Sequence, residues 1–401
     1  MTALDALIQD AQAAAVWPTT ALSEAEAQVQ RQLTICNGCR YCESFCPVFS
    51  AMTRRLTFAQ ADVHHLANLC HNCGACLHAC QYAEPHEFAI NIPRAMAQVR
   101  AQTYAQFAWP PALGRLYQRQ GLTLSLALVL GLALVLGLVV ALQAMQVMPS
   151  ALSTGSARAT GAGFYAVMPH AAMVALFLPV FAWSALALLM GVSRFMRGIT
   201  PTTSGASLTA VASAEAVHHA LRLKHLDGGH GEGCHNEDDA WTHARKRAHH
   251  LTFYGFVLCF LATSVATLYH YVWHWPAPYD WLSLPKVLGI LGGVFMVVGT
   301  SWLWRLHRSR HPLHIEPSQR TMDRGFIALL FLVASTGLAL MLARGSVAMP
   351  PLLIVHLACV MAFFLTMPYS KMAHGFYRLA ALLRHSVEKR QPNHLGVGGD
   401  A

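Results

Sequence analysis

The first chemical signal in the chain is the spacing of its cysteines, most of which lie in two short runs near the N-terminus. Each run has the pattern C-x2-C-x2-C-x3-C, first in "CNGCRYCESFCP" and again in "CHNCGACLHAC". The cysteines are Cys36, Cys39, Cys42, Cys46, Cys70, Cys73, Cys76 and Cys80. Thiols spaced in this way indicate a metal or iron–sulfur site, because a disulfide framework would spread its cysteines along the chain.

The spacing predicts two [4Fe-4S] clusters that exchange one ligand between the runs. In bacterial two-cluster ferredoxins, the fourth cysteine of each run ligates the other cluster. We therefore expect cluster 1 on Cys36, Cys39, Cys42 and Cys80, and cluster 2 on Cys46, Cys70, Cys73 and Cys76. Structural zinc sites are the alternative, but they would favour two cysteine pairs with tetrahedral closure. Helical periodicity between the runs predicts a helical ferredoxin-like domain over residues 1–104, as in succinate dehydrogenase iron–sulfur subunits.

Composition places the rest of the chain in a membrane. Of the 401 residues, 55% are hydrophobic and only 12% are charged, which is too few charges to cover a soluble protein of this size. The uncharged runs are Gly121–Ala157, Phe164–Ser193, Leu251–Tyr279, Val287–Trp304, Gly325–Ala343 and Ser346–Ser370. Each can supply a spanning helix of roughly 20 residues. The predicted fold class is an all-α membrane protein, with the ferredoxin-like domain followed by a six-helix transmembrane bundle.

Basic residues predict the orientation and the domain boundaries. Lys and Arg concentrate at both ends of the bundle segment and in the loops near 194–248 and 305–324, which the positive-inside rule places in the cytoplasm. The N-terminus has no basic, apolar signal segment, so the cysteine domain should stay there. We expect a linker at 105–120, spans at 121–198 and 249–385, a Gly/His-rich loop at 199–248 and a tail at 386–401. A bacterial inner membrane, with both termini cytoplasmic, is the predicted location; the charge of +9 suits anionic lipid, and no nucleic-acid motif is present.

Histidines within the spans predict haem. His356 and His374 lie roughly five helical turns apart in the sixth span, which continues past the uncharged run, and would share a face. His270 and His249 are about 60° from sharing a face in the third span, which begins just before the uncharged run, whereas His250 is about 160° off and is the alternate. Antiparallel packing of these two helices would pair His249 with His374 inside and His270 with His356 outside, which makes two bis-histidine b-haem sites.

Other histidines and the scattered cysteines remain open. Each histidine at a helix end could instead be an interfacial residue that reaches toward lipid headgroups. His170, at the outer end of the second span, has no assigned partner and could serve as a third ligand or bind quinone. In the loop "GGHGEGCHNEDDAW", His230, Cys234, His235 and, further on, His243 could bind metal, although their spacing matches no named site. A cap over the inner haem and a solvated linker are both consistent with this loop.

The chain resembles the TcuB/CitB tricarballylate-utilization family over nearly its whole length. The resemblance rests on "CNGCRYCESFCPVF", "CHNCGACLHACQYAEPHEFAINIP", "GGHGEGCHNEDDAW", "HHLTFYGFVLCFLATSVATLYH" and "PYSKMAH". The last helix is also similar to the cytochrome b subunit of respiratory nitrate reductases, which supports His356 and His374 as haem ligands. The resemblance implies that the protein reoxidises the flavin of a separate FAD-dependent tricarballylate dehydrogenase (TcuA-like) and delivers electrons to membrane quinone. The product of the dehydrogenase would be cis-aconitate.

The residues themselves point the same way, because no flavin motif, Rossmann fingerprint or nucleophile–base pair is present for independent substrate chemistry. Two other function classes stay open. A quinol-driven subunit similar to the membrane modules of heterodisulfide reductases would carry electrons inward through the same carriers. A non-redox component of carboxylate uptake, stapled by zinc, would be colourless.

Overall fold

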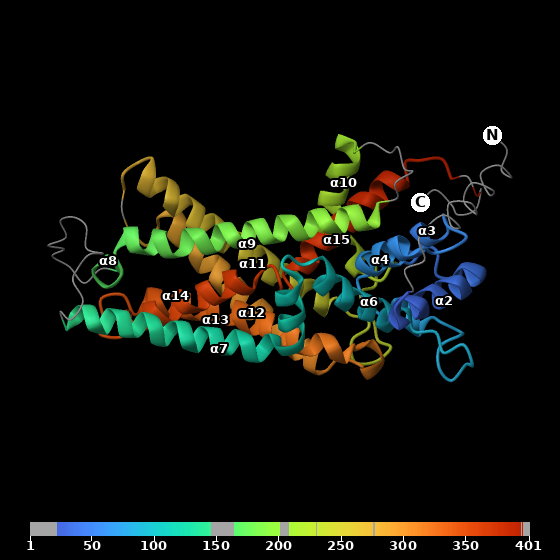
Figure 1. Ribbon diagram of the computed structural model, residues 1–401, viewed down its shortest axis with the longest axis horizontal. Coiled ribbons are helices and arrows are strands. Elements are labelled where there is room, and N and C mark those ends of the chain that lie inside the picture. The colour runs from blue at the N-terminus through green and yellow to red at the C-terminus, as the bar shows by residue number, and fades with distance from the viewer. Residues whose placement is uncertain are drawn as a thin grey trace.

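The computed structural model describes residues 22–145, 164–200, 208–229, 231–275, 277–393 and 395. Across these ranges the chain is helical without a β-strand, and its one isolated β-bridge joins Cys234 to Thr242. The molecule is elongated, with the N-terminal helices gathered at one end of a bundle of long helices (Figure 1). The predicted all-α class, with a helical domain before the bundle, is confirmed.

Short helices form the N-terminal domain and place the cysteines at their ends. They are α2 (Glu24–Cys39), α3 (Pro47–Met52), α4 (Gln60–Leu69), α5 (Ala75–His78) and α6 (Ile92–Phe107). The first begins where Ser23 and Glu26 cap each other's backbone N–H groups. Its C-cap, Arg40, has a left-handed backbone with φ of 56°, which turns the chain toward the next cysteine. Fully buried Val29, Leu33 and Leu66 form part of the shared core.

Six helices are long and apolar enough to cross a membrane, as the sequence predicts. They are α7 (Pro111–Ala144), α9 (His170–Ile199), α11 (Ala244–Tyr271), α12 (Leu284–Arg308), α13 (Arg320–Leu342) and α14 (Met349–Thr366). Helix boundaries differ from the uncharged runs because some helix ends continue into polar flanks and others stop before the run ends. α11, for example, begins before His249 and ends at Tyr271 rather than Tyr279. The end of the first run, which we predicted at Ala157, lies outside the described residues.

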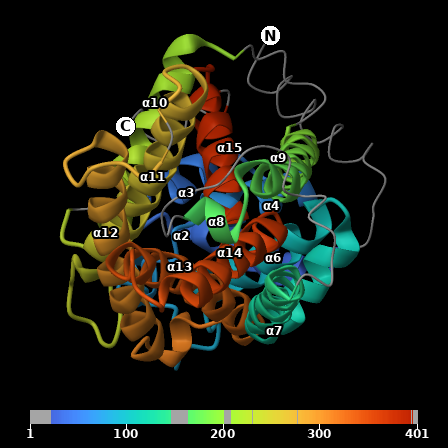
Figure 2. The same cartoon turned by 90° about the vertical axis from the view of Figure 1, so that its left-hand side faces the viewer.

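The helices of the bundle are arranged so that α12 and α13 stand between α11 and α14. Viewed along the long axis, α11 and α12 lie on one side and α7 on the other (Figure 2). A Cβ atom on Gly255 of α11 would lie 2.7 Å from the Met296 backbone nitrogen of α12, so this glycine lets the two helices approach closely. The backbones of α11 and α14 have few close contacts, but the rings of Phe256 and Phe363 join the two helices directly, with centroids 5.8 Å apart. The small-residue face around Gly255 covers α12.

The predicted sixth span is two helices. α14 ends at Thr366 and α15 (Ala373–Glu388) begins after a turn in which Ser370 N–H donates to the Thr366 carbonyl at 2.9 Å. Pro368 has no backbone N–H and so cannot continue the helix. The prediction that His356 and His374 share one helix face was thus wrong. α15 leaves the bundle and packs beside α10 (Ala210–Leu221) and α4 at the N-terminal-domain end (Figure 1).

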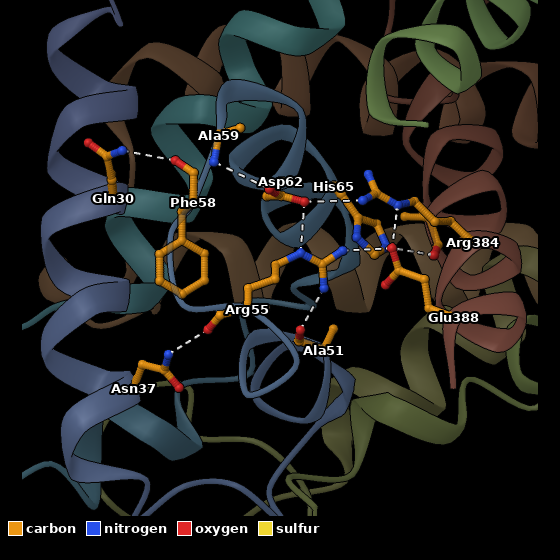
Figure 3. Close-up of polar contacts among 11 residues, drawn as sticks. Gln30, Asn37, Ala51, Arg55, Phe58, Ala59, Asp62, His65, Arg384 and Glu388 are labelled. Carbon is orange, nitrogen blue, oxygen red and sulfur yellow. Dashed lines mark hydrogen bonds and ion pairs between the residues drawn. The ribbon is translucent and has the colours of Figure 1, made fainter. Parts of the chain in front are cut away.

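A buried ion-pair network fastens α15 to the N-terminal domain (Figure 3). The Arg55 guanidinium lies 2.7 Å from an Asp62 carboxylate oxygen and 2.6 Å from one of Glu388. Arg384 contacts the same two carboxylates at 3.1 and 2.7 Å. Burial opposes the charge on Glu388, but Arg55, His65 and Arg384 outweigh it and hold the pKa of this carboxyl well below its usual range. Two cations and two anions therefore balance at this interface.

Candidate functional site

Four thiols from both cysteine runs meet at the outer edge of the N-terminal domain. Cys36 and Cys39 end α2, Cys42 lies in the following turn, and Cys80 comes just after α5. All four line one cavity of about 250 Å³, with Cys76 beside them. Burial raises the pKa of Cys36 to about 12, and the neighbouring Cys80, Cys42 and Cys39 thiols add to that rise. The structure thus places Cys80 with the first run.

The other four thiols form a second group deeper in the molecule. Cys46 is the N-cap of α3, Cys70 the C-cap of α4, Cys73 lies in the loop that follows and Cys76 in α5. Burial raises the pKa of Cys46 well above its ordinary value, with further contributions from Cys73 and Cys70. The pKa of Cys76 is raised likewise, and Cys42 of the first group is among its neighbours. The two groups are therefore adjacent, and each takes its fourth thiol from the other run.

This arrangement fits two iron–sulfur clusters better than single metal ions. Among the described residues, no three or more His, Cys, Asp or Glu side chains converge closely enough to hold one ion. A tetrahedral zinc site would need such convergence, because every sulfur lies about 2.3 Å from the same metal. Four thiols around a larger shared space suit a cluster, in which each thiol binds a different iron. Cluster binding would also remove the thiol protons that burial otherwise retains.

The Gly/His-rich loop covers the second thiol group rather than a membrane site. His235 N–H donates to the Cys73 carbonyl at 3.0 Å, and a hydrogen bond with the buried Cys234 lowers the pKa of the Cys73 thiol. Gly229 has φ of +91° and lies so close to Phe45 that a Cβ atom would be 2.1 Å from its carbonyl oxygen. The loop therefore closes over Cys73 and the residue that precedes Cys46.

His235 of the loop packs with histidines from other segments, and this group does not form a metal site among the described residues. The His235 ring lies 4.2 Å from that of His78, and His78 Nε2 is 3.1 Å from His314 Nε2. None of them belongs to a set that could hold one ion, so the metal alternative for Cys234 and His235 has no support among the described residues. His243 is the N-cap of α11. His230 lies outside the described residues.

A pair of histidines lies where α11 leaves the bundle toward the N-terminal domain. The rings of His249 and His374 are 5.9 Å apart at 72° to each other. His374 Nδ1 hydrogen-bonds the Lys371 carbonyl, which can only accept, so Nδ1 carries the proton and Nε2 is free to bind. His249 Nδ1 is buried without a partner. His250 turns toward Tyr254 instead. The structure thus brings together the pair that periodicity selected.

At the far end of the bundle, His270 and His356 each have a neighbour that the sequence did not assign. His270 stacks on His170, with ring centroids 4.0 Å apart, and so provides the contact that the sequence left unassigned. Nδ1 of His356 instead forms a hydrogen bond with Thr336 Oγ1 at 3.0 Å. Its ring packs against Gly337, where a Cβ atom would lie 3.0 Å from Cε1. Nε2 of His356 is thereby left available for a ligand.

Sequence reasoning also missed four arginines that donate to the backbone of the loop between Cys70 and Cys73. They are Arg100, Arg245, Arg310 and Arg378. Three of them contributed to the sequence prediction only as positive charges that indicate how the spans are oriented in the membrane. Their distance in sequence from the loop left no local signal of this contact.

Comparison with known proteins decides the family. The model of citrate utilization protein B matches residues 120–394, and the model of its Fer4-like domain matches residues 29–106. The chain belongs to the citrate utilization protein B family. A family member from Escherichia coli, described as citrate utilization protein B, is 51% identical over 379 residues, which cover 94% of this chain and 97% of the relative. No solved structure matches. The match to the Fer4-like domain covers both cysteine runs, which agrees with the iron–sulfur interpretation.

Proposed function

We propose that this protein takes electrons from the reduced FAD of a separate tricarballylate dehydrogenase and delivers them to membrane quinone. The relative's name supports a role in carboxylate utilization, and the resemblance to the tricarballylate-utilization family suggests the particular partner. Oxidation of tricarballylate to cis-aconitate releases two electrons and two protons, and reduction of quinone to quinol consumes the same numbers. The proposed location is a bacterial inner membrane, with both termini and the cysteine domain cytoplasmic.

One observation supports the proposal most: the candidate cofactor sites follow one another from an accessible edge of the N-terminal domain to the helix bundle. Cys36 and its group border a cavity beside Tyr41, which is 67% exposed. Cys76 joins that cavity to the buried second group. Arg378 lies between the second thiol group and the histidine pair. It donates to the Cys70 carbonyl at 2.9 Å and lies near both His249 and His374.

The proposed cofactors are two [4Fe-4S] clusters and two b haems, which supply one-electron steps when bound. Cluster 1 would be held by Cys36, Cys39, Cys42 and Cys80, and cluster 2 by Cys46, Cys70, Cys73 and Cys76. The near haem would take Nε2 of His374 and a ring nitrogen of His249. The far haem would take His356 and His270, with His170 stacked on His270 as an orienting ring. His235 and Cys234 shield the second thiol group from water.

The test uses the detergent-purified chain under anaerobic conditions. Iron, acid-labile sulfide and haem are counted per chain, and optical and EPR spectra follow stepwise reduction by dithionite and then by flavoprotein partner plus tricarballylate. We expect about eight non-haem irons and b-type haem bands that both reductants develop. The matched control is Cys259→Ser, a cysteine of α11 outside both groups. Zinc without haem bands would overturn the proposal, and reduction by dithionite but not by the partner would reject this electron donor.

A further inference from the structure

Four arginines from four separate segments converge on one short loop of the N-terminal domain, between Cys70 and Cys73. Arg100 of α6 and Arg378 of α15 both donate to the Cys70 carbonyl, the latter at 2.9 Å. The second acceptor is the carbonyl of Asn72, two residues further along the loop.

The Asn72 carbonyl accepts from Arg245 of α11 at 2.5 Å and from Arg310, just after α12, at 2.7 Å. Two carbonyl oxygens therefore accept hydrogen bonds from four guanidinium groups. Backbone carbonyls carry only partial negative charge, so they orient these cations without neutralising them.

The four arginines, of which Arg100 is buried and the others are partly buried, lack the anions that such enclosed cations require. Within the described residues, none of the four forms an ion pair with a carboxylate, and the nearby Asp323 is paired with Lys371 at 2.9 Å. Burial, followed by the charge of Arg245, lowers the pKa of Arg310 to about 9. Nε of Arg310 and of Arg378 is buried without a hydrogen-bond partner. An uncompensated cluster of buried charge is strongly unfavourable, so a negative group is expected beside it.

The ion-pair network at α15 shows the contrast within the same molecule. Arg55 is equally enclosed, yet Asp62 and Glu388 outweigh the cost of its burial and raise its pKa. Pairing arginines with carboxylates is therefore available to this fold. At the Cys70–Cys73 loop, no described carboxylate forms an ion pair with the four arginines.

The negative group is the second thiol group with its cluster. Thiolates that bind iron have lost their protons, and each reduction adds a further negative charge to the cluster they hold. Nearby positive charge stabilises the reduced form and so raises the reduction potential. At the first group, by contrast, no described arginine side chain is hydrogen-bonded to the backbone of a cluster cysteine, and the groups that shift the pKa of Cys36 and Cys42 are, besides burial, neighbouring cysteines.

We propose that Arg100, Arg245, Arg310 and Arg378 raise the reduction potential of cluster 2 above that of cluster 1, so that electrons collect on the bundle side. This inference rests on the proposed function, because it requires both clusters. The four arginines are positioning residues: they set the charge around the Cys46, Cys70, Cys73 and Cys76 group without ligating iron. Their arrangement gives electron flow a direction that the repeated cysteine motif does not contain.

The experiment is an EPR-monitored redox titration of the purified full chain and of Arg310→Gln and Arg378→Gln. Cys73→Ser, which should lose cluster 2, identifies its signal. We expect each neutral variant to lower the potential of cluster 2 by about 59 mV, which is a tenfold change in a one-electron equilibrium, while cluster 1 is unchanged. Arg310→Lys and Arg378→Lys should keep most of the potential because they retain the charge.

The controls are Arg94→Gln, an exposed arginine of α6, and Arg55→Gln, a buried arginine with its own carboxylates. Neither should alter the difference between the two potentials. The inference is overturned if both clusters are fully loaded in the Gln variants and that difference stays the same, or if Lys variants fall as far as Gln variants. Absence of iron from the unaltered chain would instead remove the proposed function, so the two failures are distinguishable.

Discussion

The two thiol groups share a motif and a ligand exchange but have different surroundings. The first group borders a cavity beside exposed Tyr41, and the residues that line this cavity lie between Cys36 and Ile92. The second is buried beneath the loop that contains Cys234 and contacts arginines from distant segments. The comparison teaches that a repeated motif can specify two similar sites, while the rest of the chain gives them different roles. Under the proposed function, the first group would receive electrons and the second would pass them onward.

The largest effect is expected from removing the exchanged ligands. Cys80→Ser and Cys46→Ser should each reduce non-haem iron from about eight to about four per chain and abolish quinone reduction by the partner. Iron analysis and EPR measure both losses. Only the cluster that survives in Cys80→Ser should respond to an added Arg310→Gln substitution. Sensitivity in the Cys46→Ser background instead would mean that the two groups are assigned the wrong way round.

The histidine pair near the second group extends the comparison into the bundle. His249→Ala and His374→Ala should each lose the near haem, about half of the total, because each ring supplies one axial nitrogen. Haem extraction and the optical spectrum measure the loss. His250→Ala is the matched control, since it is adjacent in sequence and directed toward Tyr254. Equal haem loss in His250→Ala would contradict the assignment.

At the far end, variants separate ligands from a stacking ring. His356→Ala and His270→Ala should lose the far haem, whereas His170→Ala should retain it with shifted optical bands, because His170 stacks on His270 at 4.0 Å. The same haem count and spectra provide the measurement. Complete haem loss in His170→Ala, with full retention in His356→Ala, would move the ligand role to His170.

The cap over the second group can be loosened at one glycine. Gly229→Ala would place a methyl group 2.1 Å from the Phe45 carbonyl oxygen, so the loop must move away. Exposure to air should then bleach the cluster 2 EPR signal several-fold faster and leave cluster 1 unchanged. Gly231→Ala is the control, because it has a similar φ of +84° with nothing within 4 Å. Equal acceleration in both variants would attribute the effect to backbone strain alone.

The smallest effect is expected at Glu26, which is buried in the N-terminal domain with its carboxylate 2.5 Å from His64 Nε2. Burial opposes its charge, but hydrogen bonds from His64, Ser23 and Gln60 lower its pKa to about 2. Its stabilising contribution is therefore complete above pH of about 4.5 and is lost as pH falls toward 2. Glu26→Gln should lower the thermal midpoint by a few degrees at pH 7, and this difference should shrink only below pH 4.5. Both cluster potentials should be unchanged.

The sequence predicts local features well and long-range contacts poorly. The cysteine grouping, the six apolar helices and the choice of His249 over His250 follow from spacing and helical period. Pro368 was a visible signal for the break before α15, although periodicity alone ignored it. The contact of His170 with His270 and the convergence of arginines depend on how separate helices pack, which no local pattern specifies.

The long reach of the chain around the second group has a consequence for biosynthesis. Its arginine contacts come from positions as far along as Arg310 and Arg378, whereas the cavity of the first group is lined by residues no further along than Ile92. Because a chain leaves the ribosome from its N-terminus, the first group can be complete while most of the bundle is still being translated. The surroundings of the second are finished only after the last membrane helix has been made. Maturation is therefore ordered, and a chain truncated before α15 would retain one well-formed thiol group and leave the other incomplete.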